Sequence, residues 1–403
     1  MANTLATCSI LAKEALAVLE NMLTFASNVN RDWQDEFKSN QARGYSPGAT
    51  INIKKPPRYQ YRSGRVAVPQ GTVENTVALT LSQGGTDLNF TGFERTLSVQ
   101  QMESKLQAAM ATVANEIDRQ GLNLARLASF NTIGTPGTLP TTQALALAAV
   151  TGLNQRLDEM AAPRDRQRAL IMNPALNASM IQGFAGLFNA QATLEKQFAK
   201  GIMVDSLGLA YAMDQNVDTH VNGTAVVGTN TVNGAGQQGS TITVNALNGT
   251  VTKGTKVTFA SVFAVNPQSR TSTGVLAQFT VTADAANAAT SLLISPAIVN
   301  SGAFQNVTAS PANAATITIF GTASGSFNAS VAFHKDAFTL AMVPMYAPPS
   351  GKGVIDVAQE SYKGMNMKVT EFYDGVNDNY IMRFDVLFGW AATYPELACI
   401  YAT

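Results

Sequence analysis

Apolar positions follow two different periods along the chain, and the periods divide it into helical and extended regions. In the first region, apolar residues recur at helical spacing until the sequence SNVNRDWQDEF turns polar. The residues on this stripe are Leu5, Leu11, Ala15, Leu16, Leu19, Met22 and Leu23. The pattern predicts an amphipathic N-terminal arm, to which we assign residues 1–43.

Between residues 48 and 93 the period falls to two. The segments ATINIKK, RVAVPQ, TVALTLSQ and TDLNFTGFE are rich in Thr and Val and are separated by Pro or Gly, which is typical of strands. They predict a long hairpin with its tip at KKPPRYQYRSGR, residues 54–65. Pro56 and Pro57 lack amide donors and bias Lys55 toward extended geometry, so the tip is neither a regular helix nor a central strand.

The strongest helical signal lies in residues 98–131, with Ser98 as the expected N-cap and residues 131–137 as the stop. About 32 residues at ~1.5 Å each give a rod of about 48 Å, far longer than the average helix. Such a rod is either a coiled-coil strand or a strut under a β-layer, and the lack of regular flanking charges favours the strut. Its apolar stripe consists of Val99, Met102, Leu106, Met110, Val113, Ile117, Leu124 and Leu127.

The second half of the chain changes pattern twice. Residues 142–220 alternate helix, strand and helix, which is an α/β pattern. Residues 221–331 form evenly spaced Thr/Val-rich segments with almost no charge, and these predict an inserted all-β module, a small barrel. Residues 332–403 return to long strands, two of which are joined by the hairpin turn DGVNDN.

Composition and charge limit the class of protein. The 403 residues hold 27 basic and 27 acidic side chains, so the basic run at 54–65 is a local feature of a neutral chain, unlike a dedicated DNA-binding protein. Charged residues make up only 13%, about half the usual share, which is typical of a protein that packs against copies of itself. A low-charge enzyme is the alternative at this point.

Compartment signals favour the cytoplasm. Cys8 and Cys399 stand near opposite ends and form no disulfide framework, which fits a reducing compartment. The first apolar stretch contains charged residues and follows no basic leader, so we expect neither a signal peptide nor a membrane span.

Motifs for catalysis or cofactor binding are weak. His220 and His334 bracket the predicted barrel and are better explained as polar contacts at domain boundaries than as metal ligands. GAGQQG precedes a predicted strand, where a dinucleotide motif requires a helix, and PPSGKG lacks the first glycine and the final Ser or Thr of a P-loop. Asp374 and Asp378 fit a turn. We therefore expect no enzyme, catalytic residue, metal or cofactor.

The order of these parts resembles the Hong Kong 97 capsid fold of tailed-bacteriophage major capsid (coat) proteins, specifically the Salmonella-podovirus-type coat family with an inserted β domain. The resembling stretches are GATINIKKPPRY, FERTLSVQQMESKLQAAMATVANEID, KGTKVTFASVFAVNPQSR, AFHKDAFTLAMVPM and DVLFGWAATYPELACI. The resemblance implies an α+β fold with an N-terminal arm (1–43), an extended loop or E-loop (44–83), a peripheral domain (84–141) with spine helix 98–131, a first axial part (142–220), the inserted barrel (221–331) and return strands (332–403).

The resemblance also implies a function. Copies would self-assemble as pentamers and hexamers into an icosahedral virion capsid in the bacterial cytoplasm and enclose double-stranded DNA without reading its sequence. A scaffolding protein and a portal protein are implied partners, a decoration protein is allowed, and no membrane is involved. The alternative is another self-associating phage structural protein from a tail or appendage, which the long helix and extended loop argue against.

In this fold the extended loop crosses the neighbouring subunit, so we expect its basic run to meet carboxylates of the adjacent copy. Some family members carry acidic residues in this loop, whereas this chain carries basic ones, and the partner charges stay open. The alternative is a solvated loop tip with no partner. The expected contact residues are Lys54, Lys55, Arg58, Tyr59, Tyr61, Arg62 and Arg65.

The inserted module has open alternatives as well. It steadies contacts between capsomers, strengthens folding of the monomer, or displays a surface that binds carbohydrate or another protein. Its low charge and lack of aromatic clusters favour a structural role.

Overall fold

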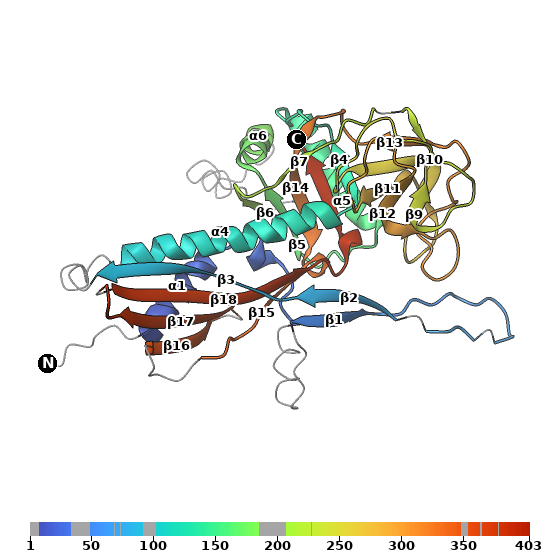
Figure 1. The fold of residues 1–403 in the computed structure, drawn as a ribbon. Helices are drawn as coiled ribbons and strands as arrows, with labels where there is room; N and C mark the ends of the chain where they lie inside the picture. Colours follow the sequence, from blue (N-terminus) through green and yellow to red (C-terminus); the bar gives the residue numbers. More distant parts are fainter. Residues whose placement is uncertain are drawn as a thin grey trace. The chain divides into compact units, whose positions relative to one another are not determined.

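The computed structural model describes residues 8–33, 49–67, 69–72, 74–91, 102–184, 207–226, 228–347, 354–362, 365–377 and 379–403. Within these ranges the chain combines α-helices with mostly antiparallel sheets, which confirms the predicted α+β class (Figure 1). It divides into two compact units. Unit 1 comprises Met1–Ile53, Thr76–Gly121 and Thr339–Ala391, and unit 2 comprises Lys54–Asn75, Leu122–Phe338 and Ala392–Thr403.

Unit 1 is built on an antiparallel sheet around its longest strand, β18. β3 and β17 both pair with β18, β16 continues the sheet from β17, and β15 pairs with the far end of β18. Asp374 pairs with Asn379 across the β17–β18 turn, which confirms the predicted hairpin. The strands are β3 (Ser82–Thr91), β15 (Thr339–Met342), β16 (Val354–Tyr362), β17 (Met365–Asp374) and β18 (Asn379–Ala391).

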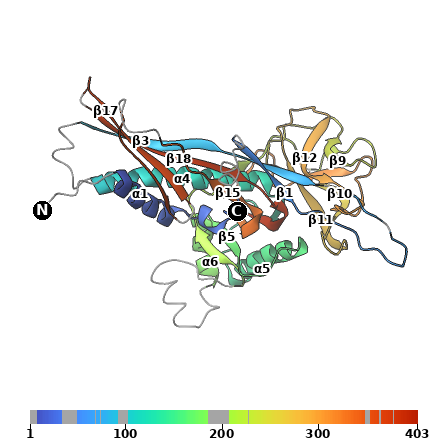
Figure 2. The same ribbon diagram turned by 90° about the horizontal axis from the view of Figure 1, so that it is seen from below.

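Two helices pack in unit 1 (Figure 2). α1 (Cys8–Met22) contacts β16 and β17, and most of its predicted apolar stripe is buried, although Met22 is exposed. α4 (Met102–Ala128) is the predicted long helix, and its first part belongs to this unit. Residues 1–7 and 92–101, which include Leu5, Ser98 and Val99, lie outside the described residues.

The apolar stripe of α4 differs from the prediction after Ile117. Gly121, Leu122 and Ala125 continue the buried face, whereas Leu124 and Leu127 are only half-buried. The reason is steric: a Cβ on Gly121 would lie 2.6 Å from the ring of Trp390 and 2.7 Å from that of Phe25. A glycine contributes nothing to a hydrophobicity count, so the pattern missed the residue that lets these rings approach.

Asp118 ties α4 to the turn after α1. Its carboxylate accepts hydrogen bonds from the backbone amides of Thr24 (2.7 Å), Phe25 (3.2 Å) and Ala26 (2.9 Å). The side chain is buried, so these charge-assisted bonds replace the water that the carboxylate loses on folding.

The core of unit 2 is a mixed sheet in the order β4-β19-β14-β5-β6, with β7 pairing to the start of β14. The predicted helix, strand and helix of residues 142–184 are confirmed as α5, β5 and α6, and both helices share the core with this sheet. The elements are α5 (Gln143–Glu159), α6 (Pro174–Phe184), β4 (Asn131–Gly134), β5 (Arg168–Met172), β6 (Ala210–Met213), β7 (Thr219–Val221), β14 (Ser326–His334) and β19 (Ala398–Ala402).

Unit 2 also holds a six-stranded sheet, in the order β8-β13-β10-β11-β12-β9. A bridge between Val232 and Val244 joins its two outer strands, so the sheet closes as a small barrel around an apolar core. Each strand predicted here from the sequence is present. The strands are β8 (Asn230–Thr231), β9 (Gly239–Thr243), β10 (Lys256–Val265), β11 (Ser272–Val281), β12 (Ser291–Ile298) and β13 (Thr316–Ile319).

Side chains of the barrel bind the backbone where α4 ends. Lys256 is buried, and its ammonium donates to the carbonyls of Arg126 (2.9 Å) and Ser129 and to the Thr280 hydroxyl (2.7 Å). The side-chain amide of Gln278 accepts a hydrogen bond from the backbone N–H of Thr132 (2.7 Å) and donates one to the Thr132 carbonyl (2.8 Å). This pair of bonds resembles the pairing of two strands. The bonds to Arg126 and Ser129 satisfy carbonyls that a helix end leaves without intrahelical partners. Burial and the charge of Arg126 lower the pKa of Lys256 well below its usual value.

His220 lies beside this joint. Arg126 Nη1 is 2.9 Å from His220 Nδ1, and because a guanidinium only donates, Nδ1 accepts. The proton of the neutral ring is then on Nε2, 3.2 Å from the Thr255 hydroxyl. Burial, reinforced by the charges of Arg126 and Lys256, lowers the pKa of His220 to about 4, and a hydrogen bond with Asn222 and the charge of Asp218 oppose this shift only in part.

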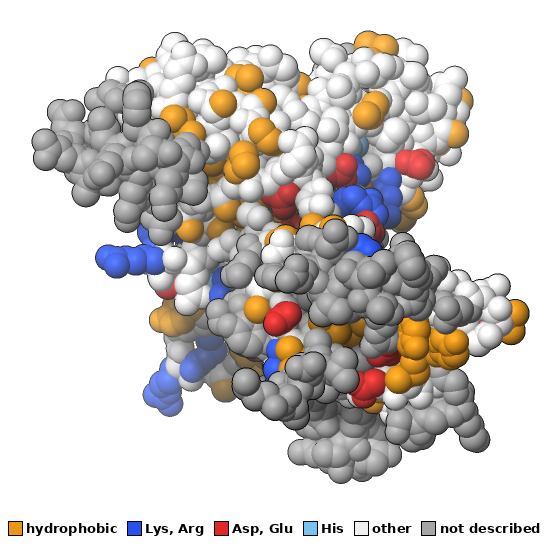
Figure 3. Space-filling model, turned by 90° about the vertical axis from the view of Figure 1, so that its left-hand side faces the viewer, with side chains coloured by type: hydrophobic (Ala, Val, Ile, Leu, Met, Phe, Trp, Pro, Cys, Tyr) orange, Lys and Arg blue, Asp and Glu red, His pale blue; other side chains and the backbone are white. Residues whose placement is uncertain are grey.

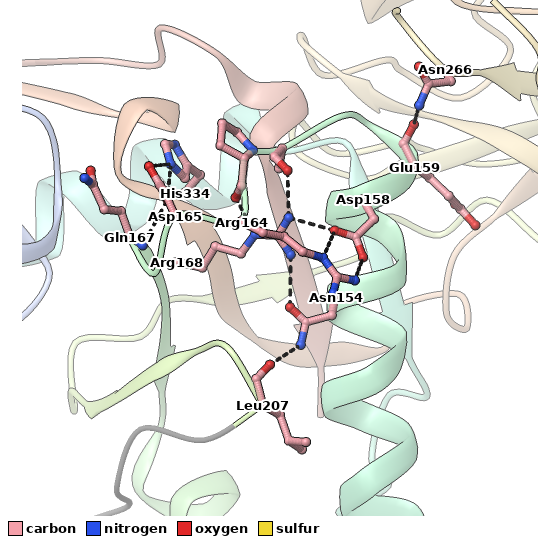
Figure 4. Close-up of polar contacts among 12 residues, drawn as sticks. Asn154, Asp158, Glu159, Arg164, Asp165, Gln167, Arg168, Leu207, Asn266 and His334 are labelled. Atoms are coloured by element: carbon pink, nitrogen blue, oxygen red, sulfur yellow. Dashed lines mark hydrogen bonds and ion pairs between the residues drawn. The ribbon is translucent and has the colours of Figure 1, made fainter. Parts of the chain in front are cut away.

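A second polar cluster fixes the end of α5 to β5 (Figure 4). Arg168 donates to Asp158 (2.7 Å), to Asn154 (3.2 Å) and to the carbonyls of Pro163 and Ala162. Asn266, from the turn after β10, donates to the Glu159 carbonyl (2.8 Å) and so connects the barrel to α5. His334 Nε2 lies 3.1 Å from Asp165. Both histidines therefore make polar contacts inside unit 2.

Few charges lie on the described surface. On the face in Figure 3, Lys, Arg, Asp and Glu side chains form small groups between larger uncharged areas. The buried side chains of Lys256 and Arg168 in unit 2, by contrast, lie where elements join.

We predict that Asp118→Asn destabilises the subunit by about 2 kcal/mol, because the amide replaces a charged acceptor with a group that is half donor. Denaturant unfolding of the unassembled protein measures the loss. Glu116→Gln is the matched control: Glu116 lies on the exposed side of α4 and pairs with Arg119, so its change should stay within about 0.5 kcal/mol. Equal small losses for both variants would contradict the role of Asp118.

We also predict that His220 makes the unfolding free energy fall as the pH becomes acidic. Its folded pKa of about 4 is below the ordinary 6.5, so the unfolded chain takes up the proton first as pH falls. Stability from this group is therefore lost progressively as pH drops from about 6.5 to about 4. The His220→Gln variant should show a flatter dependence of unfolding free energy on pH in this window, and parallel curves for wild type and variant would refute the assignment.

Candidate assembly interface

The candidate site is the loop segment of residues 56–74, which joins β1 (Thr50–Lys55) to β2 (Asn75–Thr80). Lys54 Nζ is 2.9 Å from a Glu74 carboxylate oxygen, and this ion pair bridges the two ends of the segment. RVAVPQ was predicted as a strand and is not one among its described residues. Pro69 lacks an amide donor, and side chains rather than backbone groups close the loop here.

Side chains hold the two arms of the loop segment together. The side-chain amide of Gln70 accepts a hydrogen bond from the backbone N–H of Gln60 and donates one to the Gln60 carbonyl, both at 2.7 Å. The Tyr59 and Thr72 hydroxyls are 3.0 Å apart. The segment is thus a closed hairpin without a regular ladder.

Three contacts brace the base of the loop segment against the rest of unit 2. Arg58 pairs with Glu396 at 3.2 Å, and Arg270, from the β10–β11 turn, donates to the Tyr59 carbonyl at 2.7 Å. The ammonium of Lys55 lies 5.2 Å from the centre of the Tyr394 ring, within cation–π range. Desolvation lowers the pKa of Lys55, and Glu396 partly opposes the shift.

The loop tip, residues 61–66, is exposed but internally ordered. Arg62 donates to the carbonyls of Gly64 and Val66, the latter at 2.6 Å, and Gly64 takes the positive φ of 92° that this turn requires. Tyr61 is 93% exposed and Val66 is 79% exposed. An ordered tip that presents two large apolar side chains to solvent is a feature of a contact surface.

The seven predicted residues fall into two groups. Lys54, Lys55 and Arg58 contact groups of the same chain at the loop base, and the half-exposed Tyr59 joins them. Tyr61, Arg62 and Arg65 are exposed at the loop tip. Contact with a neighbouring copy stays a prediction for all seven.

Sequence reasoning missed the partners of the loop base, which are Glu74, Gln70, Arg270, Tyr394 and Glu396. Glu74 carries a local signal, since it is the first carboxylate after the basic run. Gln70 lies within the loop segment itself, ten positions after its partner Gln60. Arg270, Tyr394 and Glu396 lie far away in the sequence, and only the folded topology brings them to the loop.

Other chemistry gives no competing site in the part of the chain that the structure describes. It contains no group of three or more His, Cys, Asp and Glu side chains able to hold a metal ion. Cys399 is buried, which raises the pKa of its thiol to about 12, so it is a poor nucleophile. Among the described helices, none is both long and apolar enough to cross a membrane.

Several solved structures are similar in fold over most of the chain. A chain from Mycobacterium phage Che8 is 11% identical, with 94% of this chain and 90% of that one covered and a TM-score of 0.49. The capsid structure of Cyanophage P-SCSP1u is 11% identical, with 88% and 83% covered and a TM-score of 0.42. A virus-like particle from Pyrococcus furiosus is 9% identical, with 97% of each chain covered and a TM-score of 0.42.

No curated protein sequence matches the chain. A family model described as "P22 coat protein - gene protein 5" matches residues 63–402. The match begins in the loop tip and continues through the barrel to β19, which is most of the chain. It confirms the resemblance expected from the order of elements, a place in the virion capsid and a structural rather than enzymatic role. The chain therefore belongs to the P22 coat protein family.

Proposed function

We propose that this protein forms the icosahedral head of a tailed double-stranded DNA phage as pentamers and hexamers of identical subunits, in which the loop tip contacts the adjacent copy. The observation that carries the proposal is the family match, which includes most of the loop tip. A scaffolding protein during assembly and a portal protein at one vertex are the partners that this role entails, and it leaves room for a decoration protein outside.

The loop base and the loop tip have different tasks in this proposal. Lys54, Lys55 and Arg58 hold the loop segment in its own subunit, through Glu74, Tyr394 and Glu396. Tyr61, Arg62 and Arg65 then meet the neighbour. Because intrachain hydrogen bonds already order the tip, a contact costs less conformational entropy than it would for an unstructured loop.

The chemistry of the tip specifies its partner surface. Residues 54–65 include no carboxylate, so the neighbour should present acidic side chains around a pocket for Tyr61. Rim charges of this kind set register and association rate more than affinity, whereas a buried tyrosine supplies binding energy.

Neutral overall charge suits a container for DNA. Each phosphate that a protein neutralises contributes about 0.9 to the slope of log DNA affinity against log salt concentration. A strongly basic inner surface would therefore bind the genome tightly at every subunit. With equal numbers of acidic and basic residues, the subunit has no net basic charge with which to bind the genome.

We propose a structural role within the same subunit for the predicted insert, residues 221–331, whose barrel strands run from β8 (Asn230–Thr231) to β13 (Thr316–Ile319), before β14 returns to the mixed sheet. Lys256, Thr280 and Gln278 bind the backbone at the end of α4, and Arg270 binds the loop base. The barrel thereby supports the segment that reaches the neighbour.

We predict that Tyr61→Ala and Arg65→Glu raise the protein concentration required for assembly by about tenfold or more, because each removes or reverses an interface group. Both side chains are exposed, so unfolding midpoints should match the wild type. Light scattering and electron microscopy of assembly with the scaffolding protein measure the effect.

The matched control is Lys253→Glu, which reverses an exposed charge on the barrel away from the loop. It should assemble as the wild type does. If Tyr61→Ala and Arg65→Glu also assembled normally into stable shells, the loop tip would be a solvated turn and the proposed contact would be wrong.

A further inference from the structure

Unit 2 contains a cavity of ≈ 580 Å³ beneath the loop base. Lys55–Arg58 form one wall, the barrel forms another, and residues 394–396 close it. This volume lies within the range of about 300–1,000 Å³ that small-molecule sites occupy. All of its lining residues belong to unit 2.

The cavity is mainly apolar and aromatic. Phe279, Phe130 and Met160 are core residues that reach its inner part, and Phe304 and Tyr394 line it nearer the loop. Several amides in the lining are already engaged: Gln278 donates to the Thr132 carbonyl and Asn306 donates to the Ala297 carbonyl. An apolar body therefore fits the cavity better than a sugar or a nucleotide.

The charges around the cavity do not balance. Lys55, Arg58 and Arg156 line it, against the single lining carboxylate of Glu396. Arg156 pairs with Glu159 at 3.2 Å, outside the cavity, and Arg58 pairs with Glu396. One positive charge is left over, that of Lys55, whose ammonium faces the Tyr394 ring.

We propose that this cavity binds a small monocarboxylate with an apolar tail, of the chemical class of medium-chain fatty acids. The tail lies among Phe279, Phe304 and Met160, and the carboxylate binds Lys55 and the free donors of Arg58. A single negative charge neutralises the excess, whereas a cationic head would add to it and a neutral head would leave it in place. The bound molecule would contact both the loop base and the barrel, so it would stabilise their contact.

Isothermal titration of the unassembled full-length protein with sodium decanoate, kept below its micellar concentration, tests the proposal. We expect saturable binding at one site per chain, together with a rise in the unfolding midpoint. Decyltrimethylammonium, which has the same tail and the opposite charge, should bind at least about tenfold more weakly.

Two variants locate the site. Lys55→Gln removes the unbalanced charge and should weaken decanoate binding about tenfold. Ala297→Trp places a large ring at an exposed lining position and should abolish binding without disturbing the core. Lys253→Gln is the matched control, since this exposed lysine does not line the cavity, and it should bind as the wild type does.

Three results would overturn the proposal: no saturable decanoate binding, equal affinity for decyltrimethylammonium, or equal loss of affinity in Lys55→Gln and Lys253→Gln. These measurements use the unassembled subunit. Their failure is therefore distinct from a failure of shell assembly, and the proposal is independent of the assembly role.

Discussion

The buried end of helix α4 imposes the constraint on which the rest of unit 2 depends. The carbonyls of Arg126 and Ser129 at this end lie beyond the intrahelical ladder, and side chains of the barrel supply their donors at fixed positions. Lys256 and Thr280 both donate to the Ser129 carbonyl, and Gln278 pairs with Thr132 as a strand would. These bonds fix the barrel to the segment that leads from α4 into β4.

The loop base depends in turn on the barrel. Arg270 extends from the turn between β10 and β11 to the Tyr59 carbonyl, and Arg58 pairs with Glu396, next to β19. A loop of about twenty residues without a regular ladder has few contacts of its own, and its order requires such braces. The chain has few charged residues, and in unit 2 several of them, Arg58, Lys256 and Arg270, lie at these joints. This distribution suits a protein whose surfaces are covered by copies of itself.

The sequence predicts the elements well and their joints poorly. Periodicity identifies α4, the barrel strands and the β17–β18 hairpin, because each buries one face and so repeats at a fixed spacing. It misplaces the later stripe of α4, where Gly121 accommodates Trp390 and Phe25 and has no hydrophobic side chain to count. RVAVPQ alternates as a strand does, yet Pro69 and the Gln60–Gln70 pair shape it as a loop.

In the candidate site, too, the sequence predicts the element but not its contacts with other elements. The basic run identifies the loop from local composition, and the exposure of Tyr61 and Arg65 agrees with a contact surface. Nothing local indicates that Arg58 pairs with Glu396, since 338 positions separate them. Charge partners of this kind depend on topology, because a sequence pattern gives spacing along one element and not proximity between elements.

The most direct test of the account is a high-resolution cryo-electron microscopy reconstruction of the assembled particle. The account predicts that Arg58 and Glu396 of the same subunit remain paired, while Tyr61 and Arg65 are buried against an acidic surface of the adjacent copy. A loop base released from its own subunit, or a loop tip that stays in solvent at every position of the shell, would contradict it.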